Sequence, residues 1–142
     1  MPTHQIVIDT NVFVSALRSR RGASFKLLSL IDSGKFQVNV SVPLILEYEE
    51  KGKQLVGGVA LTAKDIDDIL NYICKIAHRR QVFYLWRPFL KDPKDDLVLE
   101  LAVSADCAFI ITYNQRDFQG VEQFGIQAIT PKEFLGKRGA VR

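Results

Sequence analysis

The fold of this chain is decided near its amino terminus, by the stretch His4-Gln5-Ile6-Val7-Ile8-Asp9-Thr10-Asn11. The apolar run predicts a buried strand, and the short polar residues after it predict the start of a helix. In an open parallel sheet, ligands bind just outside the carboxyl ends of the strands. Asp9 therefore stands where α/β proteins carry their chemistry. Asp and Thr are also favoured helix N-caps, so capping by Asp9 or Thr10 is the simpler alternative.

The composition predicts an ordinary globular protein. With 142 residues, 47% of them hydrophobic and 25% charged, the chain is expected to form one domain over residues 1–142. No apolar run approaches the roughly 20 residues of a membrane span, and the start does not resemble a signal peptide, so we expect a cytoplasmic protein without a membrane partner. Cys74 and Cys107 lie far apart in apolar stretches, which favours reduced core thiols. The formal charge of +3 permits a phosphate-rich partner without requiring one.

Strand-like and helix-like segments alternate along the chain. Strands are predicted at 5–9, 36–41, 81–86, 107–112 and 126–130. Helices are predicted at 11–18, 22–33, 43–53, 62–78, 94–104 and 132–136. This alternation implies right-handed crossovers and a mainly parallel sheet that is covered on both faces. We therefore predict an α/β fold, a three-layer α/β/α sandwich with four or five strands, with Asp9 at the central carboxyl edge.

A second acidic residue, Glu47, belongs to the same predicted edge. Ser41 can cap the helix that contains Glu47, which places this carboxylate about one turn from the end of the preceding strand. Glu47 can therefore turn inward toward Asp9. Glu49 and Glu50, by contrast, are typical of a solvated helix face.

The densest acidic segment is Lys91-Asp92-Pro93-Lys94-Asp95-Asp96, at the start of another predicted helix. Asp92 is well placed as the N-cap, with Pro93 as the first helical residue. Capping does not explain why several acids crowd one turn, because neighbouring carboxylates repel one another unless a cation neutralises them. Oxygen ligands suit Mg²⁺ or Mn²⁺, and the lack of a His/Cys cluster in the sequence argues against zinc.

These segments, together with Thr112-Tyr113-Asn114-Gln115-Arg116-Asp117-Phe118, resemble the PIN-domain family. Within that family the chain is similar to the branch of toxin components of toxin–antitoxin pairs, and the similarity extends to the closing residues 129–134. The resemblance implies an α/β/α sandwich with a small acidic pocket. It also implies a ribonuclease that depends on Mg²⁺ or Mn²⁺.

The resemblance assigns roles to individual residues. The family's catalytic and metal-binding carboxylates are matched by Asp9, Glu47 and Asp95. Its supporting polar positions are matched by Asn11 and Thr112, and the acidic turn is supported by Asp92. Further oxygen ligands to the metal are offered by Asn114 and Asp117. Asn114 stands where many members carry a fourth Asp, so the chain departs from the family pattern at this position.

The activity implied is endonucleolytic hydrolysis of phosphodiester bonds in single-stranded RNA. A divalent ion would lower the pKa of a bound water, polarise the phosphoryl oxygen and align the attack. The partner implied in the cell is an antitoxin protein, and a homodimer is left open. Candidate phosphate contacts are Arg18, Arg20, Arg21, Lys91 and Arg116, although a short basic run is usually only a solvated surface. Trp86 with Arg87 could stack a base, but half-buried packing is the simpler expectation for Trp86.

Two other functions stay open at this point. Asn114 suggests a non-catalytic PIN-like protein that binds nucleic acid. A phosphoryl-transfer domain with Asp9 as the nucleophile is the other alternative. That class expects an Asp two residues after the nucleophile and a Lys after a late strand, so Asn11 counts against it.

Overall fold

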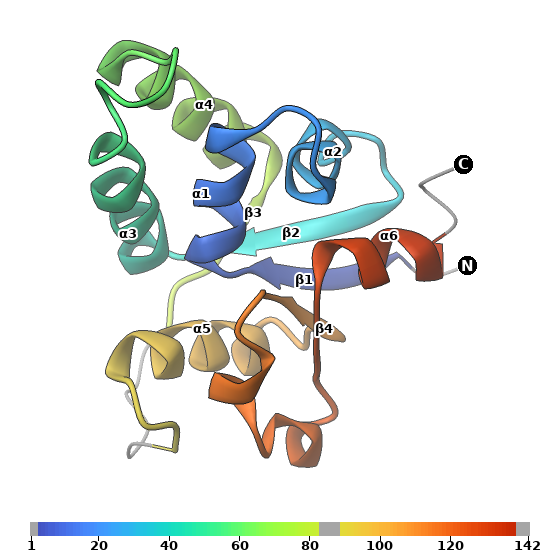
Figure 1. Cartoon of the computed structure of the whole chain (residues 1–142). Coiled ribbons are helices and arrows are strands. Elements are labelled where there is room, and N and C mark those ends of the chain that lie inside the picture. Colours follow the sequence, from blue (N-terminus) through green and yellow to red (C-terminus); the bar gives the residue numbers. More distant parts are fainter. Residues whose placement is uncertain (1–2, 83–88, 139–142) are drawn as a thin grey trace.

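The computed structural model describes residues 3–82 and 89–138, and its centre is a parallel β-sheet (Figure 1). The described strands are β1 (His4–Ile8), β2 (Phe36–Val40), β3 (His78–Arg79), β4 (Phe109–Ile111) and β5 (Gln127–Ile129). They lie in the order β3-β2-β1-β4-β5, and every neighbouring pair is parallel. Ile6 of β1 pairs with Val38 on one side and with Phe109 on the other. β1 is therefore the central strand, as predicted.

Helices cover both faces of this sheet. One face carries α1 (Thr10–Arg18), α2 (Ala23–Ser29), α3 (Val42–Lys53) and α4 (Ala63–Ile76), and the other carries α5 (Pro93–Ser104) (Figure 1). α6 (Pro131–Arg138) packs beside α2, and its Phe134 meets Phe36 and Phe109 edge to face. Strands that are covered on both faces are rich in apolar residues, which explains the end of β1, Ile6-Val7-Ile8, and the whole of β4, Phe109-Ile110-Ile111. The predicted α/β/α class is confirmed, with five strands.

The state of the two cysteines and the character of the helices were both expected from the composition. Cys74 and Cys107 are free thiols, and Cys107 is buried in the core. Among the helices of the described ranges, none is both long and apolar enough to cross a membrane.

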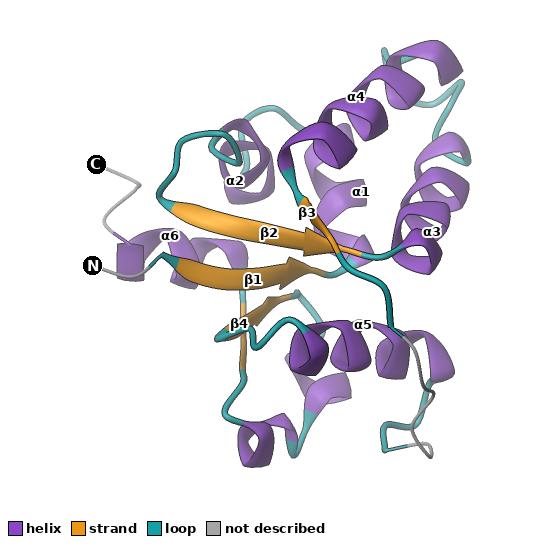
Figure 2. Cartoon of the chain, turned by 180° about the vertical axis from the view of Figure 1, so that it is seen from behind, coloured by secondary structure: helices purple, strands orange, loops and turns teal. Residues whose placement is uncertain are grey.

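The predicted edge strand at 81–86 is wrong in its described part. Gln81 and Val82 are not in a strand, and residues 83–88 lie outside the described residues. The strand beside β2 is instead β3, in which Arg79 pairs with Val40 (Figure 2). The predicted helix 62–78 consequently ends at Ile76, because the backbone turns into this pairing with β2. Tertiary pairing has overridden a helical sequence pattern here.

The predicted helix 22–33 is also too long, because α2 ends at Ser29. The amides of Leu30 and Ile31 donate to the carbonyls of Leu27 and Leu28, each three residues back. These bonds close tighter turns than those of an α-helix, and the chain then reverses toward β2.

The connections from strand to helix bring side chains to one edge of the sheet. α1 follows β1 directly with Asp9 as its N-cap, and α3 follows β2 with Ser41 as its N-cap. The ring of Tyr48 in α3 stacks on Phe13 of α1 with 4.7 Å between the ring centroids, and the Tyr48 hydroxyl donates to the carbonyl of Ile8. α3 is thereby held against the carboxyl end of β1.

Candidate acidic active site

Asp9 is a buried carboxylate at the junction of β1 and α1, where its side chain is only 8% exposed. Its Oδ1 accepts a hydrogen bond from the amide of Thr10 at 2.8 Å, which makes it the N-cap of α1. Its Oδ2 accepts one from the hydroxyl of Thr112, also at 2.8 Å. Burial nevertheless raises the pKa of Asp9, and these two hydrogen bonds only partly oppose that effect. Capping and a place in the site are therefore compatible roles for the same residue.

Thr112 organises the polar groups around Asp9. Its side chain is fully buried at the end of β4, where the hydroxyl donates to Asp9 and accepts from the amide of Asn114 at 3.0 Å. The side-chain amide of Asn11 also approaches this hydroxyl, at 3.4 Å, and the Asn11 carbonyl oxygen accepts from the amide of Tyr113. The residues predicted to be supporting, Asn11 and Thr112, thus join the end of β4 to the start of α1.

A cleft of about 700 Å³ opens above Asp9, between α1 and α3 on one side and α5 on the other. Its acidic and amide lining residues are Asp9, Asn11, Glu47, Gln54, Asp92, Asp95, Asn114 and Asp117. Its cationic lining residues are Arg18, Lys51 and Lys94. The acidic side chains predicted to meet at this edge therefore line the same hollow.

The three acidic residues at the start of α5 have different structural roles. Asp92 accepts from the amide of Lys94 at 2.9 Å and is the N-cap, as predicted. Asp96 accepts from the amides of Phe89 and Leu90, and so holds the segment before the helix. Asp95 lies in the cleft between them, with its pKa raised to about 7. Burial is the largest cause of that shift, followed by repulsion from Asp9 and from Asp117.

Glu47 of the cleft has a cation opposite it. The Nζ atom of Lys94 lies 3.7 Å from its Oε1 atom, so this ion pair connects α3 with α5 across the cleft. Sequence reasoning missed Lys94 and Lys51 as residues of the cleft. Lys51 could have been found, because it follows Glu47 by four residues and so lies on the same face of the helix.

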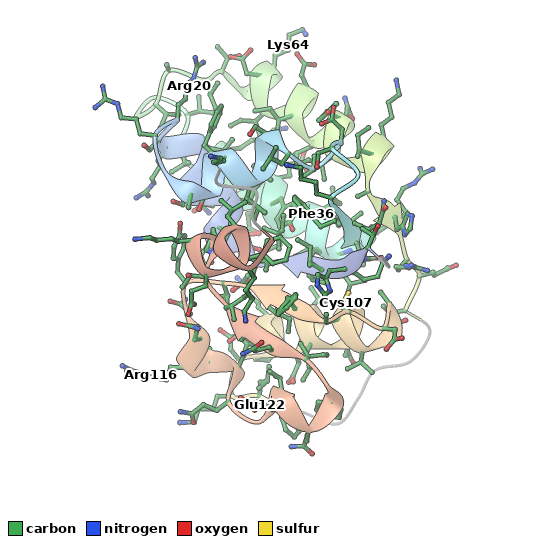
Figure 3. All side chains as sticks on the ribbon, turned by 90° about the vertical axis from the view of Figure 1, so that its right-hand side faces the viewer. Arg20, Phe36, Lys64, Cys107, Arg116 and Glu122 are labelled. Atoms are coloured by element: carbon green, nitrogen blue, oxygen red, sulfur yellow. The ribbon has the colours of Figure 1, made fainter. Side chains whose placement is uncertain are left out.

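The basic residues predicted to contact phosphate do not all lie near the acids. Arg18 lines the cleft itself, and Lys91 and Arg116 line a groove that adjoins it. Arg20 and Arg21 line hollows beside α2 instead. Figure 3 shows Arg20 in the upper part of the view and Arg116 in the lower part. Trp86 and Arg87 lie outside the described residues.

The donor chemistry of the cleft fits a hard divalent cation, because all of its candidate ligands offer oxygen atoms. Burial, and to a lesser extent repulsion from neighbouring carboxylates, raises the pKa values of Asp9 and Asp95, so their charged forms are disfavoured without a cation. Within the residues that the structure describes, no three Asp, Glu, His or Cys side chains are already close enough together to hold a metal ion. Side-chain rotation would have to complete such a site.

A parallel α/β sheet with an acidic cleft at its central carboxyl edge places its polar side chains where α/β proteins bind their ligands. The family model of the PIN domain matches residues 5–116, and the chain belongs to the PIN-domain family. PIN domains are generally nucleases. The match includes Asp9, Glu47, Asp95 and Asn114, whereas Asp117 lies just beyond it. A comparison with curated proteins found no match.

Proposed function

We propose that this chain is an endoribonuclease that hydrolyses phosphodiester bonds of single-stranded RNA with the help of Mg²⁺ or Mn²⁺. In this proposal, residues 1–142 act as one nuclease domain. The supporting observation is that carboxylates from the end of β1, from α3 and from α5 line one cleft together with cationic side chains. An acidic floor suits a divalent ion, and cations at its rim suit the phosphates of a nucleic acid.

The proposed metal-holding residues are Asp9, Glu47 and Asp95, with further oxygen atoms from Asn114 and Asp117. A divalent ion bound there would supply Lewis-acid activation of water and of the phosphoryl group. Thr112 keeps the Asp9 carboxylate in one orientation through its hydrogen bond. Lys94, which faces Glu47 across the cleft, can turn to a substrate phosphate when another cation replaces it at that carboxylate.

We propose an antitoxin protein as the cellular partner, in the cytoplasm, on the basis of the motifs shared with toxin components. The family match supports nuclease activity in general, and the toxin role rests on those motifs.

The decisive experiment is cleavage of labelled single-stranded RNA by the purified chain in Mg²⁺ or Mn²⁺. We expect cleavage that EDTA stops and that Asp95→Asn abolishes. Asp106→Asn is the matched control, because Asp106 is exposed just beyond the other end of α5 and has a positive φ of 54° that Asn tolerates. Equal cleavage by the wild type and Asp95→Asn would refute the site, since it would indicate a contaminating nuclease.

A second candidate function is nucleic-acid binding without catalysis. It is favoured by Asn114, which brings an amide to the cleft where many PIN domains carry an Asp. If the chain binds RNA but never cleaves it, and Asn114→Asp switches cleavage on, this second function replaces the first. We expect the opposite, namely that the chain with Asn114 already cleaves.

A further inference from the structure

A second groove meets the acidic cleft at the start of α5. It has a volume of about 410 Å³ and is lined by Phe89, Leu90, Lys91, Arg116 and Gln119, together with acids of the cleft. The acids common to both hollows are Asp92, Asp95 and Asp117. A chain lying through the cleft can therefore continue past the carboxylates into this groove.

Phe89 is an exposed aromatic side chain in this groove that the surrounding residues hold in place. Its ring is 39% exposed, and its backbone amide donates to the carboxylate of Asp96. The ring meets Phe124 edge to face, with 5.2 Å between the centroids and 73° between the planes. Because 39% of Phe89 stays exposed beside this contact, the residue is accessible to a further flat partner.

Gly120 makes room for this arrangement. It has a positive φ of 93°, and a Cβ atom at this position would lie 3.2 Å from the Cζ atom of Phe89. A larger residue at position 120 would therefore push against the ring. The absence of a side chain at Gly120 thus leaves space for the Phe89 ring.

The charged side chains of the groove indicate that its flat partner carries negative charge. Lys91 and Arg116 line it with Phe89, so an aromatic ring and two cations stand beside the proposed catalytic carboxylates. Single-stranded nucleic acids bind to such surfaces, with bases stacked on aromatic rings and phosphates on basic side chains. Neither a purely apolar peptide nor a free anion would use both features.

We propose that this groove is a nucleotide subsite, in which a base of the single-stranded substrate stacks on Phe89 while Lys91 and Arg116 contact the adjoining phosphates. This inference rests on the proposed function. The subsite takes a nucleotide on one side of the bond to be cut, and the cleft with Arg18 and Lys51 takes the strand on the other side. A strand that is held on both sides is cut internally, so the groove also accounts for endonucleolytic action.

The test measures binding of a fluorescent single-stranded RNA octamer by anisotropy, in EDTA so that it is not cleaved. We expect Phe89→Ala and Phe89→Leu to bind about tenfold more weakly and Phe89→Trp to bind at least as well as the wild type, because Leu is apolar but cannot stack. The matched control is Tyr72→Ala, since Tyr72 is an aromatic residue that is 43% exposed on α4, outside the groove. Thermal melting of each variant in the same buffer reports on folding.

A series of octamers with one abasic nucleotide at each position in turn identifies the stacked base. One abasic position should weaken binding by the wild type and cause no further loss in Phe89→Ala. Unchanged binding by Phe89→Leu, or equal losses at every abasic position in both proteins, overturns the subsite. If Asp95→Asn abolishes cleavage while Phe89→Leu binds normally, the subsite fails and the nuclease function stands. If the wild type neither binds nor cleaves RNA, both fail.

Discussion

Replacing Asp95 by Asn should stabilise the metal-free protein at neutral and alkaline pH. Asp95 has a pKa raised from 3.8 to about 7 in the folded chain, because burial and the carboxylates of Asp9 and Asp117 disfavour its charge. A raised pKa means that the folded state binds the proton more tightly than the unfolded state does. The stability that this group contributes is therefore fully present below pH 3.8 and is lost progressively as the pH rises to about 7.

The size of the effect follows from the shift and from the exposure of the group. The difference between 3.8 and about 7 is about 3 pH units, which would correspond to about 4 kcal/mol at about 1.36 kcal/mol per unit for a fully buried group. Asp95 is only partly buried, and solvent screening reduces the expected value to about 1–2 kcal/mol. Asn resembles the neutral acid in shape and cannot ionise, so it escapes this penalty.

Urea denaturation in EDTA, repeated from pH 4 to pH 8, measures this difference. We expect the free energies of unfolding of the wild type and Asp95→Asn to agree near pH 4 and to diverge toward pH 8, where the variant is more stable. Asp106→Asn serves as the control and should follow the wild type. Excess Mg²⁺ should reverse the order at pH 8, because a ligand that binds only the folded state stabilises it. Curves that stay parallel over the whole range, or an Asp95→Asn protein that is less stable at pH 8 in EDTA, would refute the electrostatic account of the cleft.

Three further predictions follow from the contacts in and around the cleft. Asp92→Ala should lower the free energy of unfolding by about 1 kcal/mol, which is the typical contribution of an N-cap, and should leave much of the RNA cleavage. If cleavage is lost while the stability is unchanged, the third metal ligand is Asp92 and not Asp95. Thr112→Val should lower the free energy of unfolding, measured by urea denaturation, by about 1.5–3 kcal/mol, because a buried hydrogen bond to the carboxylate of Asp9 is lost. A variant as stable as the wild type would show that Thr112 does not stabilise the charge of Asp9. Lys51→Met should weaken RNA binding in EDTA and should reduce the slope of log K against log salt concentration by about one released counterion. An unchanged slope would exclude Lys51 from the phosphate contacts.

Much of the architecture could be predicted because its signals are local. The alternation of apolar strands with amphipathic helices predicted the α/β class, and strong capping residues such as Ser41 and Asp92 marked helix starts within a residue or two of those observed. Asp9 could be placed at the central edge because β1 is apolar and is followed at once by a helix. Periodicity and capping depend on residues a few positions apart, so a sequence displays them directly.

The edge strand was harder to predict because its pairing is not local. β3 contains only His78 and Arg79, which are exposed and carry no strand-like alternation. They are extended because β2 offers them a hydrogen-bonding edge. Partners brought together from distant parts of a chain are decided by tertiary packing, which local propensity does not encode.

The sequence by itself determined which residue types could make an acidic site and near which strand ends they would lie. The resemblance had already singled out Asp95, but only the tertiary structure showed that the neighbouring Asp96 holds the segment before α5. It alone placed Lys94 opposite Glu47, and Thr112 between Asp9 and Asn11. The physical reason is that a carboxylate's role depends on its burial and on its neighbours in space. Both quantities exist only after segments about a hundred residues apart have packed together.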